Sequence, residues 1–273
     1  MICLILNNMD TKELDKTQGH WILAKMGKRV LRPGGKELTL KLLSNLHISS
    51  ADSIVEFAPG IGFTAAKIIA QQPKSYIGID ADRDVVKLLS KKFKSNNNVN
   101  FKFASASDSG LESMSKDKVM GEAMLTMHNN ERKSEIVREA HRILKQNGLY
   151  AIHELGLRNI DKDKLNEINK DLQLSIKVHA RPLTEEEWKN LLIKKGFEIV
   201  RVFTNEMHLL EKKRIIDDEG FLRTLKIGYN ILTNSKAKER ILEMRTIFRK
   251  HKQHLNAVAI IARKIYRFGL LHA

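Results

Sequence analysis

A glycine turn between an apolar run and a helix-like segment is the first candidate for chemistry. The run Ser53–Phe57 contains residues that favour strands, and two glycines one residue apart, Gly60 and Gly62, follow it. Glycine permits backbone angles that other residues avoid, and it lets the main chain lie directly against a ligand. From Ala65 onward the sequence is helix-like, and a helix that begins just behind the turn offers free N–H groups. The pattern therefore predicts a strand, a ligand-binding turn and a helix.

Two acidic residues narrow the class of ligand that this turn binds. The turn alone also satisfies the looser dinucleotide fingerprint, Gly-x-Gly-x-x-Ala, which ends at Ala65. A carboxylate at Glu56, at the tip of the strand, is expected to face the pocket and attract an ammonium or sulfonium group, whereas a pyrophosphate gains nothing from it. Asp80 ends the next apolar run, Tyr76–Ile79, about 20 residues past the turn, where an acid binds the ribose hydroxyls of an adenosine ligand.

A third motif lies downstream, where the segment Glu139–Lys145 leads to Gly148 and then to the apolar run Leu149–Ile152. Together with the glycine turn and Asp80, this order resembles the class I S-adenosylmethionine-dependent methyltransferases, in particular the methyltransferase type 11 group and its small-molecule enzymes. The resemblance extends from about residue 53 to residue 154, and more loosely from 180 to 264. It implies S-adenosyl-L-methionine as cofactor, S-adenosyl-L-homocysteine as product and a small-molecule acceptor.

The resemblance also implies which residues contact the cofactor, because the family binds it at the ends of the first four strands. After the third strand the family commonly places an aspartate on the adenine amino group. Here that loop reads Ala-Ser-Ala-Ser-Asp over residues 104–108, so either Ser105 replaces the aspartate or Asp108 reaches in from further along the loop. The expected cofactor-binding residues are Glu56, Phe57, Ala58, Gly60, Gly62, Asp80, Ala81, Ser105, Ala106, Asp108 and Glu122.

Methyl transfer requires few catalytic groups. The sulfonium carbon is already electrophilic, so the protein's main task is to hold it in line with a nucleophile in a dry pocket. A general base is needed only when the acceptor must lose a proton. Glu122, His128 and Glu154 follow the fourth and fifth predicted strands and are the candidates. A structural hydrogen-bonding role is the competing interpretation for all three, and it is favoured for His153.

The elements that position these residues alternate between strand and helix. This order predicts an α/β fold with a Rossmann-like, doubly wound, mostly parallel sheet of seven strands, the last of them antiparallel and inserted between the fifth and sixth. Thr184 and Glu187 form a predicted capping box at the start of a helix that ends at Gly196. The other predicted elements are strands 99–103, 117–121, 197–203 and 257–262 and helices 84–93 and 161–172.

Two further regions are expected to cover this core. Residues 19–46 predict two helices joined at residues 32–35. In the family the first segment, here with His20, Trp21, Lys28 and Arg29, lies over the cofactor and forms part of the acceptor pocket; packing is the competing interpretation for Trp21. Residues 207–256 are basic with helical periodicity, and we expect either a lid over the acceptor or an oligomer interface. The expected division is an N-terminal helical cap (1–48), a methyltransferase core (49–206 and 257–266) and a helical insertion (207–256).

Composition limits the remaining possibilities. The chain has 273 residues, of which 42% are hydrophobic, so it can bury a substantial core. A net charge of +16 leaves RNA open as an alternative acceptor, but the positive charge is spread along the chain and nucleic acid is not favoured. Cys3 is the only cysteine, which excludes an internal disulfide. Neither the short apolar stretch Met1–Leu6 nor any other is long enough for a signal or a membrane span, so we expect a cytoplasmic protein.

Other functional classes have weaker support in the sequence. His251 and His254 are three residues apart with no carboxylate or thiol at ligand spacing, so no metal site is predicted and a solvated basic face is expected there. No Tyr-x-x-x-Lys motif accompanies the glycine turn, which counts against a short-chain reductase. An NAD(P)-dependent oxidoreductase and a non-catalytic member of the methyltransferase fold remain as alternatives.

Overall fold

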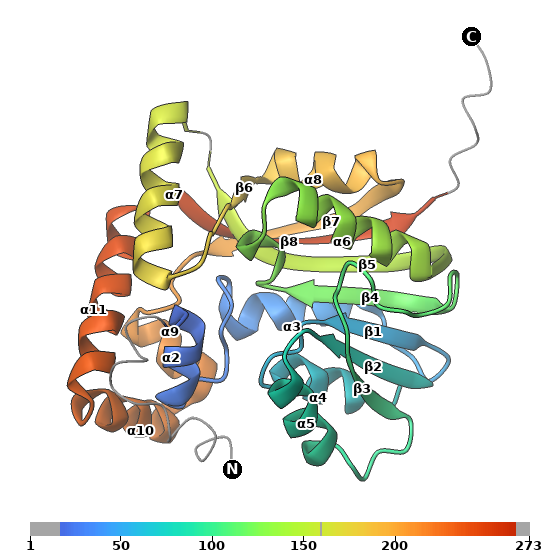
Figure 1. Cartoon of the computed structure of the whole chain (residues 1–273), viewed down its shortest axis with the longest axis horizontal. Helices are drawn as coiled ribbons and strands as arrows, with labels where there is room; N and C mark the ends of the chain where they lie inside the picture. Colours follow the sequence, from blue (N-terminus) through green and yellow to red (C-terminus); the bar gives the residue numbers. More distant parts are fainter. Residues whose placement is uncertain (1–16, 159, 266–273) are drawn as a thin grey trace.

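A single central sheet organises the computed structural model, which describes residues 17–158 and 160–265 (Figure 1). Its strands follow the order β3-β2-β1-β4-β5-β8-β7. Strands β1 to β5 pair in parallel, and β8 lies antiparallel between β5 and β7. The predicted seven-stranded Rossmann-like sheet is therefore confirmed. The strands are β1 (Ser53–Phe57), β2 (Ser75–Asp80), β3 (Val99–Phe103), β4 (Lys116–Glu122), β5 (Leu144–Leu157), β7 (Phe197–Glu206) and β8 (Leu255–Lys264), with a two-residue β6 (Leu183–Thr184) beside β5.

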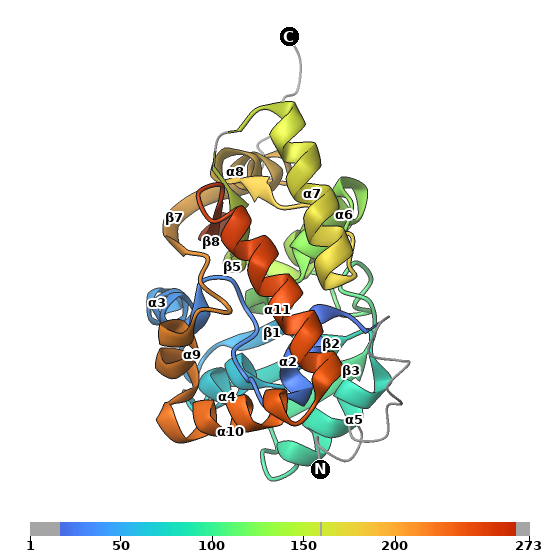
Figure 2. The ribbon, with the colours of Figure 1, turned by 90° about the vertical axis from the view of Figure 1, so that its left-hand side faces the viewer.

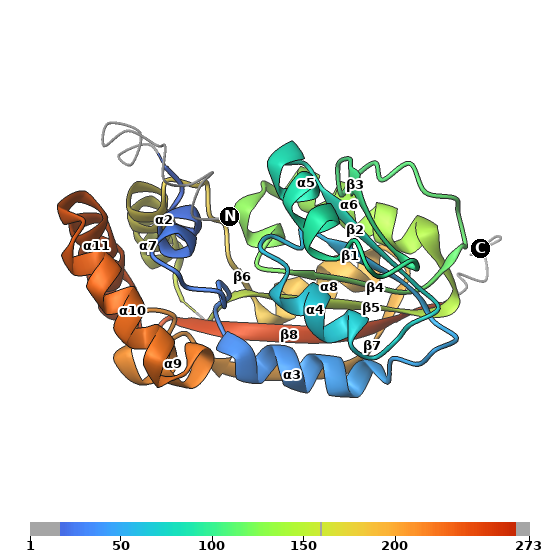
Figure 3. The same cartoon turned by 90° about the horizontal axis from the view of Figure 1, so that it is seen from below.

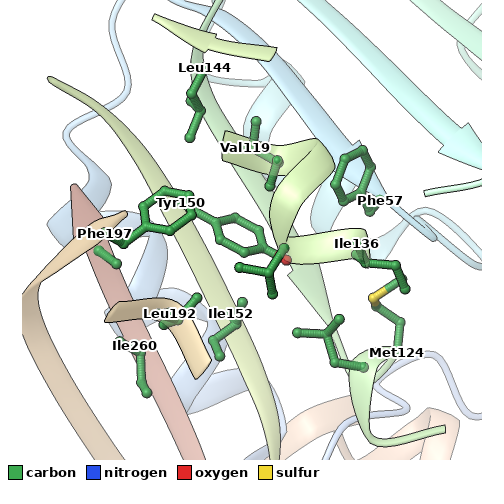
Figure 4. Close-up of a cluster of buried hydrophobic side chains, with 14 of the residues drawn as sticks. Phe57, Val119, Met124, Ile136, Leu144, Tyr150, Ile152, Leu192, Phe197 and Ile260 are labelled. Atoms are coloured by element: carbon green, nitrogen blue, oxygen red, sulfur yellow. The ribbon is translucent and has the colours of Figure 1, made fainter. Parts of the chain in front are cut away.

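Helices cover both faces of this sheet, as its strands require, since β1 is buried along its whole length. Figure 4 shows one face, where Tyr150 and Phe57 pack among aliphatic side chains beneath α6 and α8. The other face packs against α3, α4 and α5, and Figure 3 shows α3 lying along β8. These helices are α3 (Gly35–Leu46), α4 (Phe63–Ile69), α5 (Arg83–Lys92), α6 (Asn130–Ile143) and α8 (Glu185–Lys194).

Side-chain caps explain where several helices begin. Asp82 accepts hydrogen bonds from the first turn of α5, and Asn129 does the same for α6. The predicted capping box of α8 is present, because the Thr184 hydroxyl accepts from the Glu187 N–H while the Glu187 carboxylate accepts from the Thr184 N–H. This capping box thus fixes the start of α8 directly after β6.

The remaining helices gather beyond one end of the sheet (Figures 1 and 2). Figure 2 shows α11 running past α2 and α7, and the three helices contact one another. Ile22, Ile227 and Met244, from α2, α10 and α11, belong to one buried apolar cluster. The expected N-terminal helices and the helical insertion between the last two strands of the core are confirmed. These helices are α2 (Gly19–Lys25), α7 (Lys162–Ile176), α9 (Lys212–Glu219), α10 (Phe221–Leu232) and α11 (Ser235–Lys250).

Two further expectations from the sequence concern the first residues of the chain and membrane-spanning helices. Cys3 and the apolar stretch Met1–Leu6 lie outside the described residues. Within the described residues, none of the helices combines the length and the apolar character needed to cross a membrane.

Candidate active site

A large cavity, of about 570 Å³, lies where four parallel strands end. The turn after β1, the end of β2, the loop after β3 and the end of β4 all contribute to its wall. We call it the strand-end cavity. Seven of the expected cofactor-binding residues line it, namely Ala58, Gly60, Asp80, Ala81, Ser105, Ala106 and Glu122, whereas Glu56, Phe57, Gly62 and Asp108 do not.

The two glycines of the turn have different tasks. Both have positive φ, +54° for Gly60 and +76° for Gly62. A Cβ added to Gly60 would meet no atom within 4 Å, so the main chain there faces open space in which a ligand can lie. A Cβ added to Gly62 would come within 2.6 Å of Leu89 on α5. Gly60 therefore forms the cradle of the cavity, while Gly62 allows α4 and α5 to pack closely.

Asp80, at the end of β2, is one of the acidic residues that line the strand-end cavity. Its Oδ1 accepts a hydrogen bond of 2.9 Å from the backbone N–H of Asp82. Burial raises the pKa of Asp80 to about 6. Its carboxylate is ionised at neutral pH and lies where the sequence predicts the ribose hydroxyls.

The loop after β3 offers Ser105 and Ala106 to the cavity. The Ser105 Oγ accepts a hydrogen bond of 2.8 Å from Arg132 and lies 3.0 Å from the Ser107 hydroxyl. Asp108 is exposed, and its backbone N–H donates to the Ser105 carbonyl. Of the two alternatives for the adenine contact, the geometry thus favours Ser105, because the Asp108 side chain does not line the cavity.

Glu56 and Phe57 lie in the sheet rather than at the cavity wall. Phe57 is fully buried in the core cluster of Figure 4. The Tyr76 hydroxyl donates a 2.5 Å hydrogen bond to Glu56, whose pKa is raised to about 8 by burial. Glu56 is therefore largely protonated at neutral pH. The expected attraction of a Glu56 carboxylate for a cationic ligand is not supported, because the side chain turns toward the neighbouring strand β2.

Glu122 lines the strand-end cavity at the end of β4 and is held by several partners. Its carboxylate accepts hydrogen bonds from Thr39 (2.6 Å), Thr64 (2.5 Å) and His153 (2.9 Å), and Arg32 Nη1 lies 3.5 Å away. Burial alone would raise its pKa, but Arg32 and His153 outweigh burial and lower it to about 2. A carboxyl group of such low pKa is a permanent anion and a poor proton acceptor.

His153 links this carboxylate to the N-terminal segment. The Gly34 N–H donates to its Nε2 at 3.1 Å, so Nδ1 carries the proton and donates to Glu122. The side chain is fully buried. This contact supports the structural interpretation of His153 and ties the link between α2 and α3 to the ends of β4 and β5.

Glu154 and His128 differ in their relation to the cavity. Glu154 is fully buried and accepts hydrogen bonds from the backbone N–H groups of Met124, Leu125 and Thr126 and from the Thr126 hydroxyl. It shapes the loop after β4 and is not among the lining residues, so its expected role as a base is not supported. His128 does line the cavity, and burial together with nearby cationic side chains lowers its pKa.

A second, smaller cavity, of about 80 Å³, adjoins the first. Its wall comes from α2, α7, α11, the end of β5 and the segments around Val178 and Met207. We call it the apolar cavity. Sequence reasoning missed most of its residues, because they come from distant segments and share no local motif. Five residues line both cavities: His20, Leu31, Ala123, Met127 and Val178.

A cluster of possible metal ligands lies apart from both cavities. Glu167, Asp171 and His251 bring their ligand atoms within 4.8 Å of one another. The Lys250 Nζ lies 2.7 Å from both carboxylates, and His251 Nε2 lies 2.8 Å from Asp171. The expectation of a solvated His251 is wrong, because its side chain is buried against Asp171. Lys164 also pairs with Glu167 at 2.8 Å, so two ammonium groups neutralise these two acids and the cluster is an ion-pair network that joins α7 to α11.

Comparisons with known proteins agree with this geometry. A family model described as a methyltransferase domain matches residues 54–148. The chain is 33% identical over 249 residues to an uncharacterised protein of Haemophilus influenzae, covering 90% of this chain and 98% of the relative. It is 31% identical over 147 residues to an uncharacterised methyltransferase of Schizosaccharomyces pombe, covering 54% of this chain and 55% of the relative.

The fold is also similar to that of an enzyme with a bound methyl donor. Phosphoethanolamine N-methyltransferase 2 of Haemonchus contortus, in complex with S-adenosyl-L-methionine, matches with a TM-score of 0.66 and 16% identity, covering 97% of this chain and 60% of that one. The fold of the chain is therefore similar to that of S-adenosylmethionine-dependent methyltransferases, and residues 54–148 match a methyltransferase domain. The open turn at Gly60 and the acid at Asp80 fit S-adenosyl-L-methionine as a ligand of the strand-end cavity.

Proposed function

We propose that the protein transfers the methyl group of S-adenosyl-L-methionine to a small-molecule acceptor by in-line displacement. The observation that carries this proposal is the junction of the two cavities at Ala123 and Met127, beside the carboxylate of Glu122. An acceptor in the apolar cavity can approach a methyl group held at the end of β4. Its lone pair forms the new bond to carbon, the carbon–sulfur bond breaks, and the electron pair remains on the sulfur of S-adenosyl-L-homocysteine.

In this proposal the strand ends bind successive parts of the cofactor. Asp80 accepts hydrogen bonds from the ribose, Ser105 and Ala106 contact the adenine, and the backbone at Gly60 lies against the amino-acid part. The permanent anion at Glu122 supplies negative charge near the sulfonium. Of the three candidate bases, His128 is the one that lines the strand-end cavity and is not a permanent anion.

We further propose that the insertion, residues 207–256, acts as a lid together with the N-terminal helices. It contributes Met207, Leu209, Met244 and Phe248 to the apolar cavity. The outer face of α10 supports the alternative of an oligomer interface, because Leu222 is 81% exposed there. A monomer whose insertion gains protection from hydrogen exchange on cofactor binding would favour the lid, whereas a stable dimer protected without cofactor would favour the interface.

Binding and transfer assays test the central proposal. Calorimetric titration is expected to detect S-adenosyl-L-homocysteine binding and no comparable binding of NADPH. With a radiolabelled methyl donor, label is expected in a small-molecule extract. Tight NADPH binding without a response to S-adenosyl-L-homocysteine would contradict the proposal, and incorporation into an RNA fraction alone would replace the small-molecule acceptor with RNA.

A further inference from the structure

The chemistry of the apolar cavity limits what the acceptor can be. The described residues that line it include no lysine, arginine, aspartate or glutamate. A charged acceptor would therefore lose its hydration there without gaining an ionic partner, which is costly. An uncharged acceptor avoids this cost.

The softness of the lining favours an apolar group. The cavity volume is only about 80 Å³, so an acceptor of more than a few atoms requires the lining side chains to move. Three methionines, Met127, Met207 and Met244, line it together with Phe248. Methionine side chains adapt to irregular apolar shapes and make favourable contacts with aromatic rings.

Two residues could offer a polar contact inside this cavity, and one of them is already engaged. The Thr126 hydroxyl donates to Glu154 at 2.7 Å and is committed to the loop after β4. The His20 ring lies 5.1 Å from the Trp21 ring, and no hydrogen bond joins the His20 side chain to any part of the chain that the structure describes. Its nitrogens are available to a ligand.

His20 stands at the junction of the two cavities, where the acceptor meets the methyl group. Burial lowers its pKa to about 4, so the imidazole is neutral near pH 7. A neutral imidazole can accept a hydrogen bond from an O–H or N–H group, which directs a lone pair of the acceptor atom toward the methyl carbon. As the new bond forms, the acceptor's proton can pass to the free ring nitrogen.

We propose that the apolar cavity binds an uncharged, predominantly apolar acceptor and that His20 positions its single nucleophilic group for methylation. This inference rests on the proposed function. It assigns a substrate class to the cavity, and it assigns to His20, which the family resemblance places only in a segment over the cofactor, the task of orienting the acceptor and taking up its proton.

Para-substituted phenols test the substrate class in the presence of saturating S-adenosyl-L-homocysteine. From 4-ethylphenol to 4-hexylphenol, calorimetry is expected to show an affinity gain of up to about fourfold per added methylene, equivalent to about 0.8 kcal/mol per buried CH₂. Anionic 4-hydroxybenzoate and cationic tyramine are expected to bind at least tenfold more weakly than 4-ethylphenol. Equal binding of the charged probes, or no dependence on chain length, would overturn the proposal.

A matched pair of substitutions locates the binding. Met207→Lys places a charge in the apolar cavity, where Met207 is 6% exposed, whereas Met114→Lys changes a methionine that is 51% exposed elsewhere. Met207→Lys is expected to weaken 4-hexylphenol binding at least 30-fold, and Met114→Lys less than twofold. If Met207→Lys does not fold, Met207→Gln is expected to weaken 4-hexylphenol binding at least fivefold. Unchanged probe binding in the folded Met207 variant would place the acceptor elsewhere.

The role of His20 is tested by comparing 4-hexylphenol with 4-hexyltoluene, which lacks the hydroxyl. His20→Ala is expected to shift the ratio of the two affinities about fivefold toward the toluene, the size of one hydrogen bond. His20→Gln is expected to restore part of the preference, and His179→Ala, at an exposed histidine outside both cavities, to leave it unchanged. An unchanged ratio in His20→Ala would remove His20 from the proposal.

These experiments distinguish an error in the substrate class from an error in the proposed function. If S-adenosyl-L-homocysteine binds but none of the phenols do, the substrate class is wrong and the methyltransferase proposal stands. If S-adenosyl-L-homocysteine does not bind the native protein, the proposed function itself fails.

Discussion

The strand-end cavity and the apolar cavity meet at shared residues, yet they are built in different ways. The first is made by short loops at the ends of consecutive strands, and its main features are backbone angles and single polar groups. The second is made by side chains of helices that pack beyond the sheet and of the segments that join them to the sheet, from residue 19 to residue 248. Local sequence fixes the former, whereas tertiary packing creates the latter.

The two cavities also differ in the ionisable residues that line them. Ionisable residues of both signs line the strand-end cavity, including Asp80, Glu122 and Arg132, whereas His20 alone among the described residues introduces an ionisable side chain into the apolar cavity. Donor binding should therefore respond to charge and pH, and acceptor binding to volume and to any introduced charge. Changes confined to one cavity sharpen this distinction, and a change that affects both would break it.

The largest effect is expected at Arg32, which joins the N-terminal segment to the strand-end cavity. Its Nη1 donates to Thr64 at 2.9 Å and lies 3.5 Å from Glu122, whose side chain is 3% exposed. Arg32→Ala leaves that carboxylate buried without its cation, so we expect a loss of about 3–5 kcal/mol in unfolding free energy. Chemical denaturation followed by circular dichroism measures it.

Arg214→Ala is the matched control for this change. Arg214 pairs at 3.3 Å with Glu37, but Glu37 is 73% exposed, so the expected loss is about 1 kcal/mol or less. Adding Glu122→Gln to Arg32→Ala should recover part of the lost stability, because the uncompensated charge is removed. Equal losses at Arg32 and Arg214 would show that the buried network contributes no more than a surface pair.

Asp80 is expected to give the next largest effect, on donor affinity alone. Asp80→Ala removes the charge-assisted hydrogen bonds to the ribose, so we expect S-adenosyl-L-homocysteine to bind more weakly by about 1–3 kcal/mol. Asp108→Ala, at an exposed position outside the cavity, should change the affinity little. Calorimetry with both variants measures the difference. Weaker binding of 4-hexylphenol to Asp80→Ala would break the separation between the two cavities.

The pH dependence of donor binding is a smaller expected effect of the same carboxyl group. The ionised form of Asp80 binds the ribose hydroxyls, and its pKa is about 6 in the free protein. Affinity for S-adenosyl-L-homocysteine should therefore be constant above pH 7 and fall as pH drops through 6, approaching tenfold per pH unit. Calorimetric titrations between pH 5 and pH 8 check this, and Asp80→Asn should reduce the change in affinity across this pH range. A fall in affinity toward high pH would contradict it.

The same contrast explains what the sequence could predict. Strands Ser53–Phe57 and Val99–Phe103 have the predicted bounds, and the capping box at Thr184 begins a helix as expected. Each rests on residues that are adjacent or three apart, so propensity and hydrogen-bonding chemistry suffice. The glycine turn and Asp80 belong to the same kind of signal.

What the sequence could not predict depends on partners far away in the chain. Glu56 lies where expected in β1, but the sheet register brings the Tyr76 hydroxyl to its carboxyl group. His251 is buried because Asp171, eighty residues earlier, lies on the helix packed against it. The apolar cavity needs the insertion, the N-terminal helix and α7 in one place. Such contacts follow from tertiary packing, which leaves no local pattern.

The smallest expected effect concerns the backbone of the turn itself. Ala58 has φ of +51°, in the left-handed region where a side chain costs about 1–2 kcal/mol, and glycine would remove that cost. Glycine also gives the unfolded chain more freedom, which costs about 0.5–1 kcal/mol, so Ala58→Gly should stabilise the fold by roughly 0.5 kcal/mol. Denaturant midpoints measured beside the native protein provide the test.

Ala66→Gly is the control for this change and is expected to lower the stability of the fold. Ala66 lies inside α4, where glycine brings no relief and should cost about 1 kcal/mol. If Ala58→Gly destabilises the protein as much as Ala66→Gly does, the left-handed backbone at Ala58 is not strained in the folded chain. The strand-end cavity would then owe its shape to packing around the turn, as the apolar cavity does, and the difference in how the two are built would disappear at this point.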